Sequence, residues 1–188
     1  AFGKFQKELA DFPAASLYET IPNFHNTPIR FDNLKTAIAK NTAGRAALVQ
    51  KEIDFALSYG DRIHVVTDGI ADGSIPLRVT HNDTKLNNIL FSPDKDVCIS
   101  VIDLDTVMPG SLLYDFGDAL RFAASSAAED ETDLNRVWCR LDLFEAFTRG
   151  YLREMYGEIT PRELELLPFS VLLMTYECGI RFLTDYLD

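Results

Sequence analysis

The sequence predicts a mainly α-helical domain that carries one small β-hairpin, an α+β arrangement. Two patterns predict it. Apolar residues recur at helical spacing toward both ends of the chain, whereas two short β-rich segments flank a Ser-Pro-Asp-Lys turn near its middle. A chain of 188 residues is long enough to bury a sizeable core within one domain.

We expect the N-terminal part to consist of helices joined by loops. A short helix is predicted over residues 2–12, followed by a proline-bearing loop. Asp32 is suited to cap a second helix, which continues to about Tyr59 with a break near Gly44, because its apolar residues have helical spacing. The glycines at both ends of residues 69–73 predict a loop there.

The middle of the chain carries the predicted strands. Residues 77–80 are expected to form a brief extended segment. Residues 89–91 and 97–102 are rich in β-branched and aromatic residues, so we expect them to pair as a hairpin. A loop is predicted from Asp103 to Gly110.

The C-terminal part is predicted to be helical. Residues 114–127 and 134–156 are expected to form two helices joined by an acidic linker, with Trp138 packed on the helical core. Thr160 is followed by proline and, three positions on, by glutamate, which is the form of a capping box at a helix start. Pro168 is expected to divide the helical stretch that follows.

The most informative motif lies directly before the hairpin. His81 to Asn88 fit the pattern H-x-D-x-x-x-x-N, and the second strand ends at Asp103, which follows Asp83 by 20 positions (103 − 83). This combination is typical of the catalytic loop of kinase-like phosphotransferases. Phosphoryl transfer needs a carboxylate that orients the attacking hydroxyl, and an amide and a second carboxylate that hold Mg²⁺ on the phosphates. Asp83, Asn88 and Asp103 supply these groups in that order.

The same region carries a resemblance to a known family. Segments 80–90, 102–110, 114–118 and 181–186 resemble the aminoglycoside phosphotransferase and choline kinase family. Within it they are most similar to bacterial N-acetylhexosamine 1-kinases, which phosphorylate the anomeric hydroxyl of N-acetylglucosamine or N-acetylgalactosamine. The resemblance therefore implies a sugar kinase with ATP as co-substrate, Mg²⁺ as cofactor and an N-acetylhexosamine as acceptor.

The resemblance also implies the C-terminal lobe of a protein-kinase-like fold over residues 1–188. It places the catalytic loop at 80–90, the metal-binding strand end and loop at 97–110, and a helical subdomain at 114–188. No Gly-rich phosphate loop and no lysine in a V-A-I-K-like setting occurs upstream. We therefore expect the N-terminal lobe to be absent from this chain, to be its partner in the whole protein, and to be needed for efficient turnover.

Asp83 and Lys85 are the predicted catalytic residues. Asp83 is expected to position the sugar hydroxyl. Lys85 is expected to offset charge on the transferring phosphate, with an ordinary loop lysine as the alternative. Asn88 and Asp103 are the predicted Mg²⁺ ligands. Asp105 is expected either to bind a second metal ion or only to order its loop.

Two residues are expected to support the loop without taking part in the reaction. His81 is predicted to be structural, packing and hydrogen-bonding beneath the loop. Asp115 begins an Asp-Phe-Gly triplet, but it lies 32 positions after Asp83 (115 − 83) and follows no predicted strand. We expect it to start a helix and to accept amide hydrogen bonds from the loop. His25 and His64 are interpreted as ordinary loop or helix-end residues without partners.

The predicted sugar-binding residues lie on the C-terminal helices. Arg121 follows the Asp115 helix start, and Glu177, Arg181 and Asp185 are spaced by four, so that they share one helix face. Such side chains can hydrogen-bond sugar hydroxyls. The alternative is a solvated ladder of i,i+4 ion pairs.

Composition limits the other functions. The formal charge is 18 − 29 = −11, which argues against nucleic acid or an anionic membrane as a main partner. No run of about 18 apolar residues predicts a membrane span. Three widely spaced cysteines predict reduced thiols and a cytoplasmic location. The alternatives are a non-catalytic kinase-like binding module and a kinase for another small alcohol, such as choline or an aminoglycoside.

Overall fold

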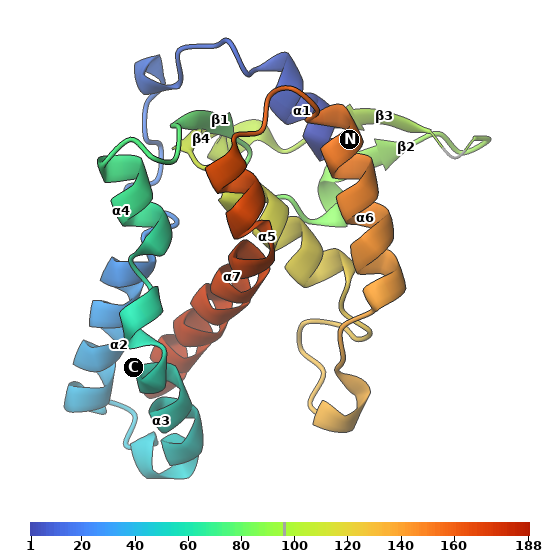
Figure 1. Ribbon diagram of the computed structural model, residues 1–188. Helices are drawn as coiled ribbons and strands as arrows, with labels where there is room; N and C mark the ends of the chain where they lie inside the picture. The colour runs from blue at the N-terminus through green and yellow to red at the C-terminus, as the bar shows by residue number, and fades with distance from the viewer. Residues whose placement is uncertain (96) are drawn as a thin grey trace.

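A computed structural model describes residues 1–95 and 97–188 of the chain. Helices dominate it, and two small antiparallel sheets lie near one end (Figure 1). The predicted class, mainly α with a small hairpin, is confirmed. The helices are α1 (Phe2–Glu8), α2 (Thr27–Lys40), α3 (Gln50–Ser58), α4 (Val65–Ala71), α5 (Leu112–Ala123), α6 (Leu141–Glu154) and α7 (Pro161–Leu187). The strands are β1 (Arg78–Thr80), β2 (Ile89–Phe91), β3 (Cys98–Val101) and β4 (Met108–Gly110).

Helices α5 and α7 cross at the centre of the molecule (Figure 1). α5 is buried along most of its length, and α7 packs against both α5 and α2. Gly117 permits the crossing, because a β-carbon there would lie 2.4 Å from the backbone oxygen of Ser170. This close approach fixes the position of α5, and with it the acidic residues Asp115 and Asp118.

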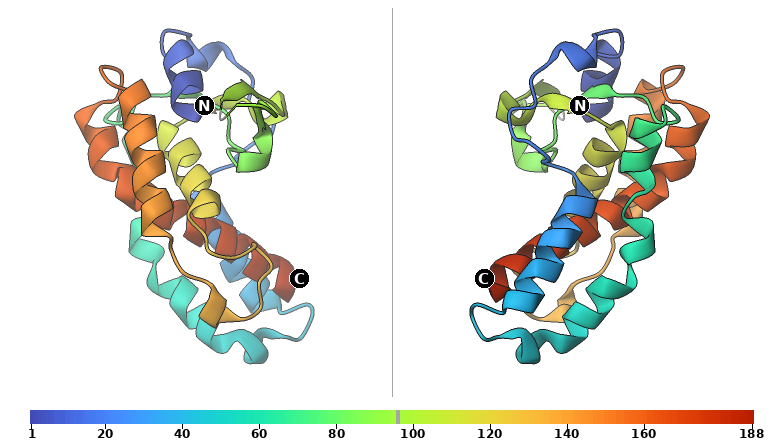
Figure 2. Two further views of the ribbon diagram at one scale, coloured as in Figure 1. Left: turned by 90° about the vertical axis from the view of Figure 1, so that its right-hand side faces the viewer. Right: turned by 90° about the vertical axis from the view of Figure 1, so that its left-hand side faces the viewer.

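Two apolar clusters form the core. One lies around α5, α6 and the first half of α7, and it includes Phe116, Leu120 and Tyr151. The second joins α2, α3 and the last half of α7, and it includes Leu34 and Ile180. α7 spans both clusters, so it connects the two halves of the elongated helical body (Figure 2).

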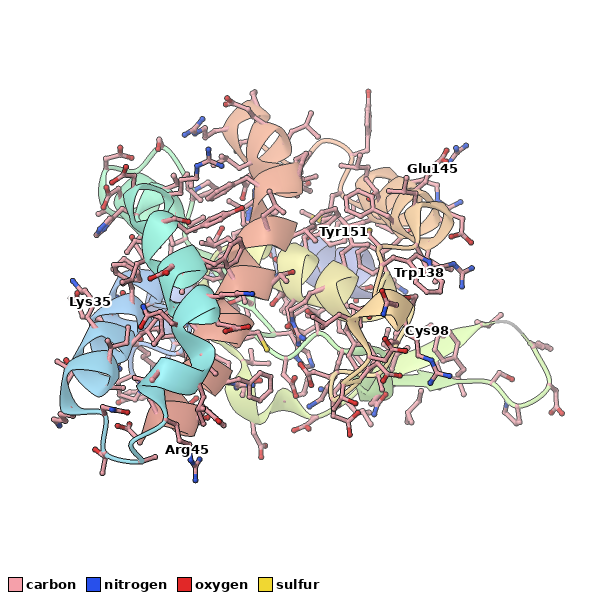
Figure 3. The ribbon with its side chains drawn as sticks, turned by 90° about the horizontal axis from the view of Figure 1, so that it is seen from below. Lys35, Arg45, Cys98, Trp138, Glu145 and Tyr151 are labelled. Carbon is pink, nitrogen blue, oxygen red and sulfur yellow. The ribbon has the colours of Figure 1, made fainter. Side chains whose placement is uncertain are left out.

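The two sheets hold the segments on either side of the 81–88 loop. β1 pairs with β4 in antiparallel register, with Arg78 opposite Gly110. β2 pairs with β3, and this hairpin extends away from the helical body, with Cys98 on it (Figure 3). The predicted extended segment and hairpin are confirmed. β4 falls in the predicted loop after Asp103, because its Met-Pro-Gly sequence has low β-propensity and only pairing with β1 makes it a strand.

The second predicted helix is in fact two helices with an earlier start. α2 begins at Thr27 rather than at Asp32, because the side chain of Asn26 caps it and a proline lies in its first turn. Asn41, in the left-handed conformation, ends α2. The predicted break near Gly44 lies in the connection to α3.

Two other N-terminal predictions need correction. α1 ends at Glu8, so it is shorter than the predicted helix over 2–12. α4 occupies residues 65–71, where a loop was predicted from 69 onward. Gly69 serves close packing rather than a turn, since a β-carbon there would lie 2.5 Å from Cδ1 of Ile75.

Three predictions for the C-terminal part are wrong. α6 begins at Leu141, and the segment before it is a 3₁₀ turn and a loop. Trp138 lies on this segment and is 57% exposed instead of packed in the core (Figure 3). Pro168 does not divide α7. It removes the donor to the carbonyl of Leu164, but Leu164 lies on the exposed side, where water can replace that donor.

A buried ion pair joins the β1–β4 sheet to α7. Nε and Nη2 of Arg78 donate to the two carboxylate oxygens of Glu163 at 2.6 and 2.9 Å. Glu163 also accepts from the amide of Thr160, which confirms the predicted capping box. Because Glu163 is fully buried, removing either partner leaves an uncompensated charge. The pair therefore anchors the strand that leads into the 81–88 loop.

α7 is also long and apolar enough, by length and composition, to cross a membrane. Its buried residues pack on α5 and α2, and two of them are the carboxylates Glu163 and Glu177, which have partners within the protein. These contacts are those of a core helix. The expectation that the chain binds no membrane stays a prediction.

Candidate active site

Asp83 lies between β1 and β2, and its carboxylate contacts two neighbouring side chains. Nδ2 of Asn88 donates to the carboxylate of Asp83 at 2.9 Å and to its backbone oxygen at 2.8 Å. Nζ of Lys85 lies 3.1 Å from the same carboxylate oxygen. A 3₁₀ turn over Leu86–Asn88 folds the chain back, so the loop brings these three side chains together.

Asp103 follows β3 and is placed beside the loop by its neighbour Ile102. The amide of Ile102 donates to the backbone oxygen of Asn88 at 3.0 Å, and its carbonyl accepts from Nε2 of His81 at 3.0 Å. Asp103 itself has a φ of 63° and an exposed side chain. This left-handed conformation is uncommon outside glycine, and it turns the chain sharply at the strand end.

Asn88 and Asp103 offer oxygen donors of the kind that Mg²⁺ prefers. The nitrogen of the Asn88 amide is engaged by Asp83, which leaves the amide oxygen for a cation. In the part of the chain that the structure describes, no group of three or more His, Cys, Asp or Glu is arranged to hold a metal ion. Mg²⁺ is usually held by one or two protein ligands together with phosphate oxygens and water, so Asn88 and Asp103 offer groups of a suitable kind for it.

The segment after Asp103 is tied to the start of the loop. Oγ1 of Thr106 donates to the backbone oxygen of His81 at 2.7 Å, and the backbone oxygen of Thr106 accepts from Nδ2 of Asn82 at 2.9 Å. Asp105 lies before these anchors with an exposed side chain. Both predicted roles for Asp105, a second metal ligand and a residue that orders the loop, are compatible with this position.

His81 is fully buried, and both of its ring nitrogens are engaged. Nδ1 accepts from the amide of Asp83 at 3.3 Å, and Nε2 donates to the carbonyl of Ile102. The rings of Phe2 and Phe5 in α1 meet it edge-on, at 5.6 and 5.7 Å between centroids. The ring is thus buried and engaged on both nitrogens beneath the loop, which supports the predicted structural role.

Asp115 is fully buried in the first turn of α5, where it accepts three hydrogen bonds. Its oxygens accept from the amides of His81 at 2.9 Å and Asn82 at 2.7 Å, and from the side chain of Gln6 in α1. Burial raises the pKa of the Asp115 carboxyl, although these donors favour its charged form. The Asp-Phe-Gly triplet thus lies inside a helix, and Asp115 faces the loop backbone.

Sequence reasoning missed Asp118, one turn further along α5. Its Oδ2 accepts from the amide of Thr84 at 3.2 Å, and its Oδ1 accepts from Nε and Nη2 of Arg121 at 3.1 and 3.0 Å. Oγ1 of Thr84 also donates to the backbone oxygen of Asp115 at 2.7 Å. The residue after Asp83 is therefore bound to α5 twice. The signal was available, since a spacing of three places Asp115 and Asp118 on one helix face.

A polar cavity of 150 Å³ opens beside Asp83, and three of the four predicted sugar-binding residues line it. Asp185, the fourth, is exposed and is not among the described residues that line the cavity. Apolar side chains complete part of the wall. The lining includes Lys85, Arg121, Glu177 and Arg181, with Phe24, Phe122 and Met174.

The cavity wall carries charges of both signs, since four basic residues lie beside four carboxylates: Arg30, Lys85, Arg121 and Arg181 with Asp83, Asp118, Glu129 and Glu177. Arg121 pairs with Asp118 and with Glu129, so its guanidinium is held in place at the wall. Arg181 lies over the ring of Phe182, 5.1 Å from the centroid, and is exposed. Arg121 is therefore preorganised, whereas Arg181 has room to turn toward a ligand.

Glu177 corrects two predictions. It is buried, and it pairs with His25 at 2.8 Å and with Arg30 at 3.3 Å, while accepting from Oγ1 of Thr27 at 2.6 Å. An i,i+4 ladder with Arg181 is therefore wrong, and so is the interpretation of His25 as a residue without partners. These partners belong to α2 and the segment before it, far away in the sequence, where no spacing rule applies.

The chain was compared with models of known protein families. The model of the phosphotransferase enzyme family matches residues 1–159. The chain belongs to this family. The resemblance to the aminoglycoside phosphotransferase and choline kinase family is thereby confirmed, and the chain is a small-molecule phosphotransferase by class.

The matched part of this phosphotransferase contains the loop and the carboxylates around it. Asp83, Asn88, Asp103 and Asp115 all lie within residues 1–159. α7, which contributes Glu177 and the other residues of one cavity wall, lies beyond that part. The family match therefore bears on the class of reaction, and the choice of acceptor has to be argued from the cavity.

Proposed function

We propose that this phosphotransferase transfers the γ-phosphate of ATP to a hydroxyl of a small molecule, with an N-acetylhexosamine phosphorylated at its anomeric hydroxyl as the favoured reaction. One observation carries the proposal. The carboxylate of Asp83 lines the polar cavity and at the same time accepts from Asn88, the candidate cation ligand. A hydroxyl in the cavity and a phosphate on the cation side would thus meet at Asp83.

Each residue of the loop has a task in this reaction. Asp83 orients the acceptor hydroxyl, whose oxygen attacks the γ-phosphorus while the bond to the β-phosphate breaks and ADP leaves. The hydroxyl proton passes to the Asp83 carboxylate. Lys85 offsets negative charge on the transferring group, since its Nζ already lies 3.1 Å from Asp83. Asn88 and Asp103 would hold Mg²⁺, which neutralises the phosphates when bound.

The cavity supports a sugar as the acceptor. Arginine and carboxylate side chains together supply donors and acceptors for several hydroxyls, and Phe24 and Phe122 offer apolar surface for a sugar ring. The volume of 150 Å³ favours a small acceptor over an extended one. The N-acetylhexosamine itself rests on the resemblance of the four sequence segments to N-acetylhexosamine 1-kinases.

A screen of ATP consumption by the full-length protein tests the proposal. Free hexosamines, N-acetylhexosamines, hexoses, choline and aminoglycosides would be offered in turn with Mg²⁺. We expect the highest kcat/KM with N-acetylglucosamine or N-acetylgalactosamine and a phosphate on the anomeric oxygen of the product. Turnover of choline or an aminoglycoside instead would keep the reaction class and remove the sugar. If ATP is not consumed with any of these acceptors, the result would favour a non-catalytic binding module.

A further inference from the structure

His25 occupies the wall between the cavity beside Asp83 and a neighbouring cavity of 280 Å³. Only 10% of its side chain is exposed. Its Nδ1 lies 2.8 Å from Oε1 of Glu177 in α7, and its Nε2 lies 3.1 Å from the backbone oxygen of Asn82 in the loop. One ring therefore links the cavity wall to the residue that precedes Asp83.

The partners of His25 determine how many protons the ring carries. A backbone carbonyl only accepts hydrogen bonds, and so does an ionised carboxylate. Glu177 also accepts from Thr27 at 2.6 Å and pairs with Arg30 at 3.3 Å, contacts that favour its ionised form. To satisfy Glu177 and Asn82 together, His25 must donate from both nitrogens, which only the imidazolium can do.

The charged and titratable groups around His25 agree with this assignment. Burial alone lowers the pKa of the His25 imidazole, but the hydrogen bond to Glu177 and the charges of Glu177 and Asp118 outweigh it, so the pKa is raised. Arg30 of α2 opposes the charge but shares Glu177. The ring of Tyr114 in α5 lies 5.1 Å away, and burial raises its pKa, so it stays neutral.

Asn82, which His25 contacts, is the most constrained residue of the loop. Its φ is 66°, a conformation that costs free energy for a residue other than glycine. Its amide donates to Asp115, its Nδ2 donates to Thr106, and its backbone oxygen accepts from His25. The peptide that joins Asn82 to Asp83 is thus held on its oxygen side by His25.

We propose that His25, as an imidazolium held by Glu177, positions Asp83 by fixing the Asn82 carbonyl. It is a positioning residue and not a catalytic one, because it reaches the reaction only through the Asn82–Asp83 peptide. The kinetic part of this proposal rests on the proposed phosphotransferase reaction. The protonation part rests on the contacts alone.

Two substitutions separate the two ends of the ring. His25→Gln places a donor near the position of Nε2, toward Asn82, whereas His25→Asn places one near Nδ1, toward Glu177. We expect kcat of the full-length protein to fall about tenfold or more in His25→Asn and no more than about threefold in His25→Gln. His64→Gln, at an exposed position outside the site, is the matched control and should equal wild type. Equal losses in the two His25 variants, or a larger loss in His25→Gln, would overturn the proposal.

The pH profile gives a signature that a purely structural role would not give. As pH rises through the raised pKa of His25, the ring loses one proton. The remaining proton stays on Nδ1, which faces the Glu177 carboxylate, so the bond to the Asn82 carbonyl is lost. Wild-type kcat should therefore decline on the alkaline side with a slope of one proton, and His25→Gln should lack that limb. An alkaline limb unchanged in His25→Gln would contradict the proposal.

A measurement without turnover keeps this proposal separate from the proposed function. ¹⁵N NMR of histidine-labelled protein at pH 7, with the His25 signal assigned by its loss in His25→Gln, reports the number of ring protons. We expect two protonated nitrogens on His25 in wild type and one in Glu177→Gln, which keeps the shape but removes the charge. A neutral His25 in wild type would overturn the proposal even if every sugar assay succeeded. A charged His25 in a protein without kinase activity would support the contact between His25 and Asn82 and would contradict the proposed phosphotransferase reaction.

Discussion

The loop that holds Asp83 and the cavity beside it are built by contacts of different range. Asn88 reaches Asp83 across five positions, and Thr106 reaches the residue two before Asp83 across 25. In the cavity, His25 reaches Glu177 across 152 positions. The first kind of contact follows from local spacing, whereas the second exists only after α2 and α7 have packed together. Motifs therefore predict the reacting groups, and tertiary packing decides what lies beside them.

Two histidines, one in the loop and one in the cavity wall, show the difference. His81 precedes Asn82 in the chain, and its ring donates once and accepts once. His25 meets Asn82 from another element and faces two acceptors, so it has to donate twice. The same residue type thus makes one donor and one acceptor bond at one position, and two donor bonds at the other. Its hydrogen-bond partners, rather than its place in a motif, set the protonation state.

Breaking the buried ion pair that anchors β1, the strand before the loop, should have the largest effect. Glu163→Ala leaves the Arg78 guanidinium buried without its partner, and we expect the free energy of unfolding to fall by about 3–5 kcal/mol. Glu165→Ala removes an exposed ion pair with Arg162 in the same helix and should cost less than about 1 kcal/mol. Urea denaturation of both variants makes the comparison. Similar losses in the two would show that the β1 anchor contributes little.

Removing the charge of the central carboxylate should abolish most turnover. Asp83→Asn keeps the shape of the side chain but not the charge that orients the hydroxyl, so kcat should fall about 10²-fold or more. The KM for the acceptor should change little, because the lost interaction acts mainly in the transition state. Steady-state kinetics beside Asp61→Asn, an exposed control, measures this. Activity retained in Asp83→Asn would remove Asp83 from the mechanism.

Changing the predicted metal ligand should alter the requirement for Mg²⁺ rather than for the acceptor. In Asp103→Ala we expect the Mg²⁺ concentration needed for half-maximal rate to rise by more than about tenfold, with part of the rate restored at high Mg²⁺. Asp94→Ala, on the exposed turn of the β2–β3 hairpin, is the control. A change in the KM for the acceptor with unchanged Mg²⁺ dependence would show that Asp103 acts in acceptor binding and not in metal binding.

The smallest expected effect is the pH dependence of stability from His25. Its pKa is raised in the folded protein, so its contribution is fully present below the unfolded value of about 6.5 and is lost as pH rises through the folded value. The slope cannot exceed about 1.4 kcal/mol per pH unit for one proton. Urea denaturation across this pH range should show the decline in wild type and not in His25→Gln. An identical decline in both would assign it to another group.

The loop and most of the central elements could be predicted from the sequence, because their determinants are local. The spacing of Asp83, Asn88 and Asp103 and the helical setting of Asp115 are visible without a fold, and the hairpin follows from β-rich segments around a turn. The start of α2 was placed too late because Asp32 is also a good capping residue, although Asn26 takes that place. Two local capping signals are present there, and the proline in the first turn accompanies the one that is used.

The rest required the fold. Glycine is typical of turns, but Gly69 lies in a helix, where the side chain of Ile75 fills the space beside it. β4 becomes a strand only through β1. In the candidate site, Asp118 has a local signal, its spacing of three from Asp115. The partners of Glu177 have none, since His25 and Arg30 meet it only after α2 lies against α7.

The most direct test of the account is a crystal structure of the full-length protein with Mg²⁺, a non-hydrolysable ATP analogue and N-acetylglucosamine. We expect the anomeric hydroxyl to lie within hydrogen-bond distance of the Asp83 carboxylate, inside the cavity lined by Arg121 and Arg181. We expect Asn88 and Asp103 to contact the cation from the other side. A sugar bound away from Asp83, or a cation held without Asn88 and Asp103, would contradict the claim that the local loop and the tertiary cavity meet at Asp83.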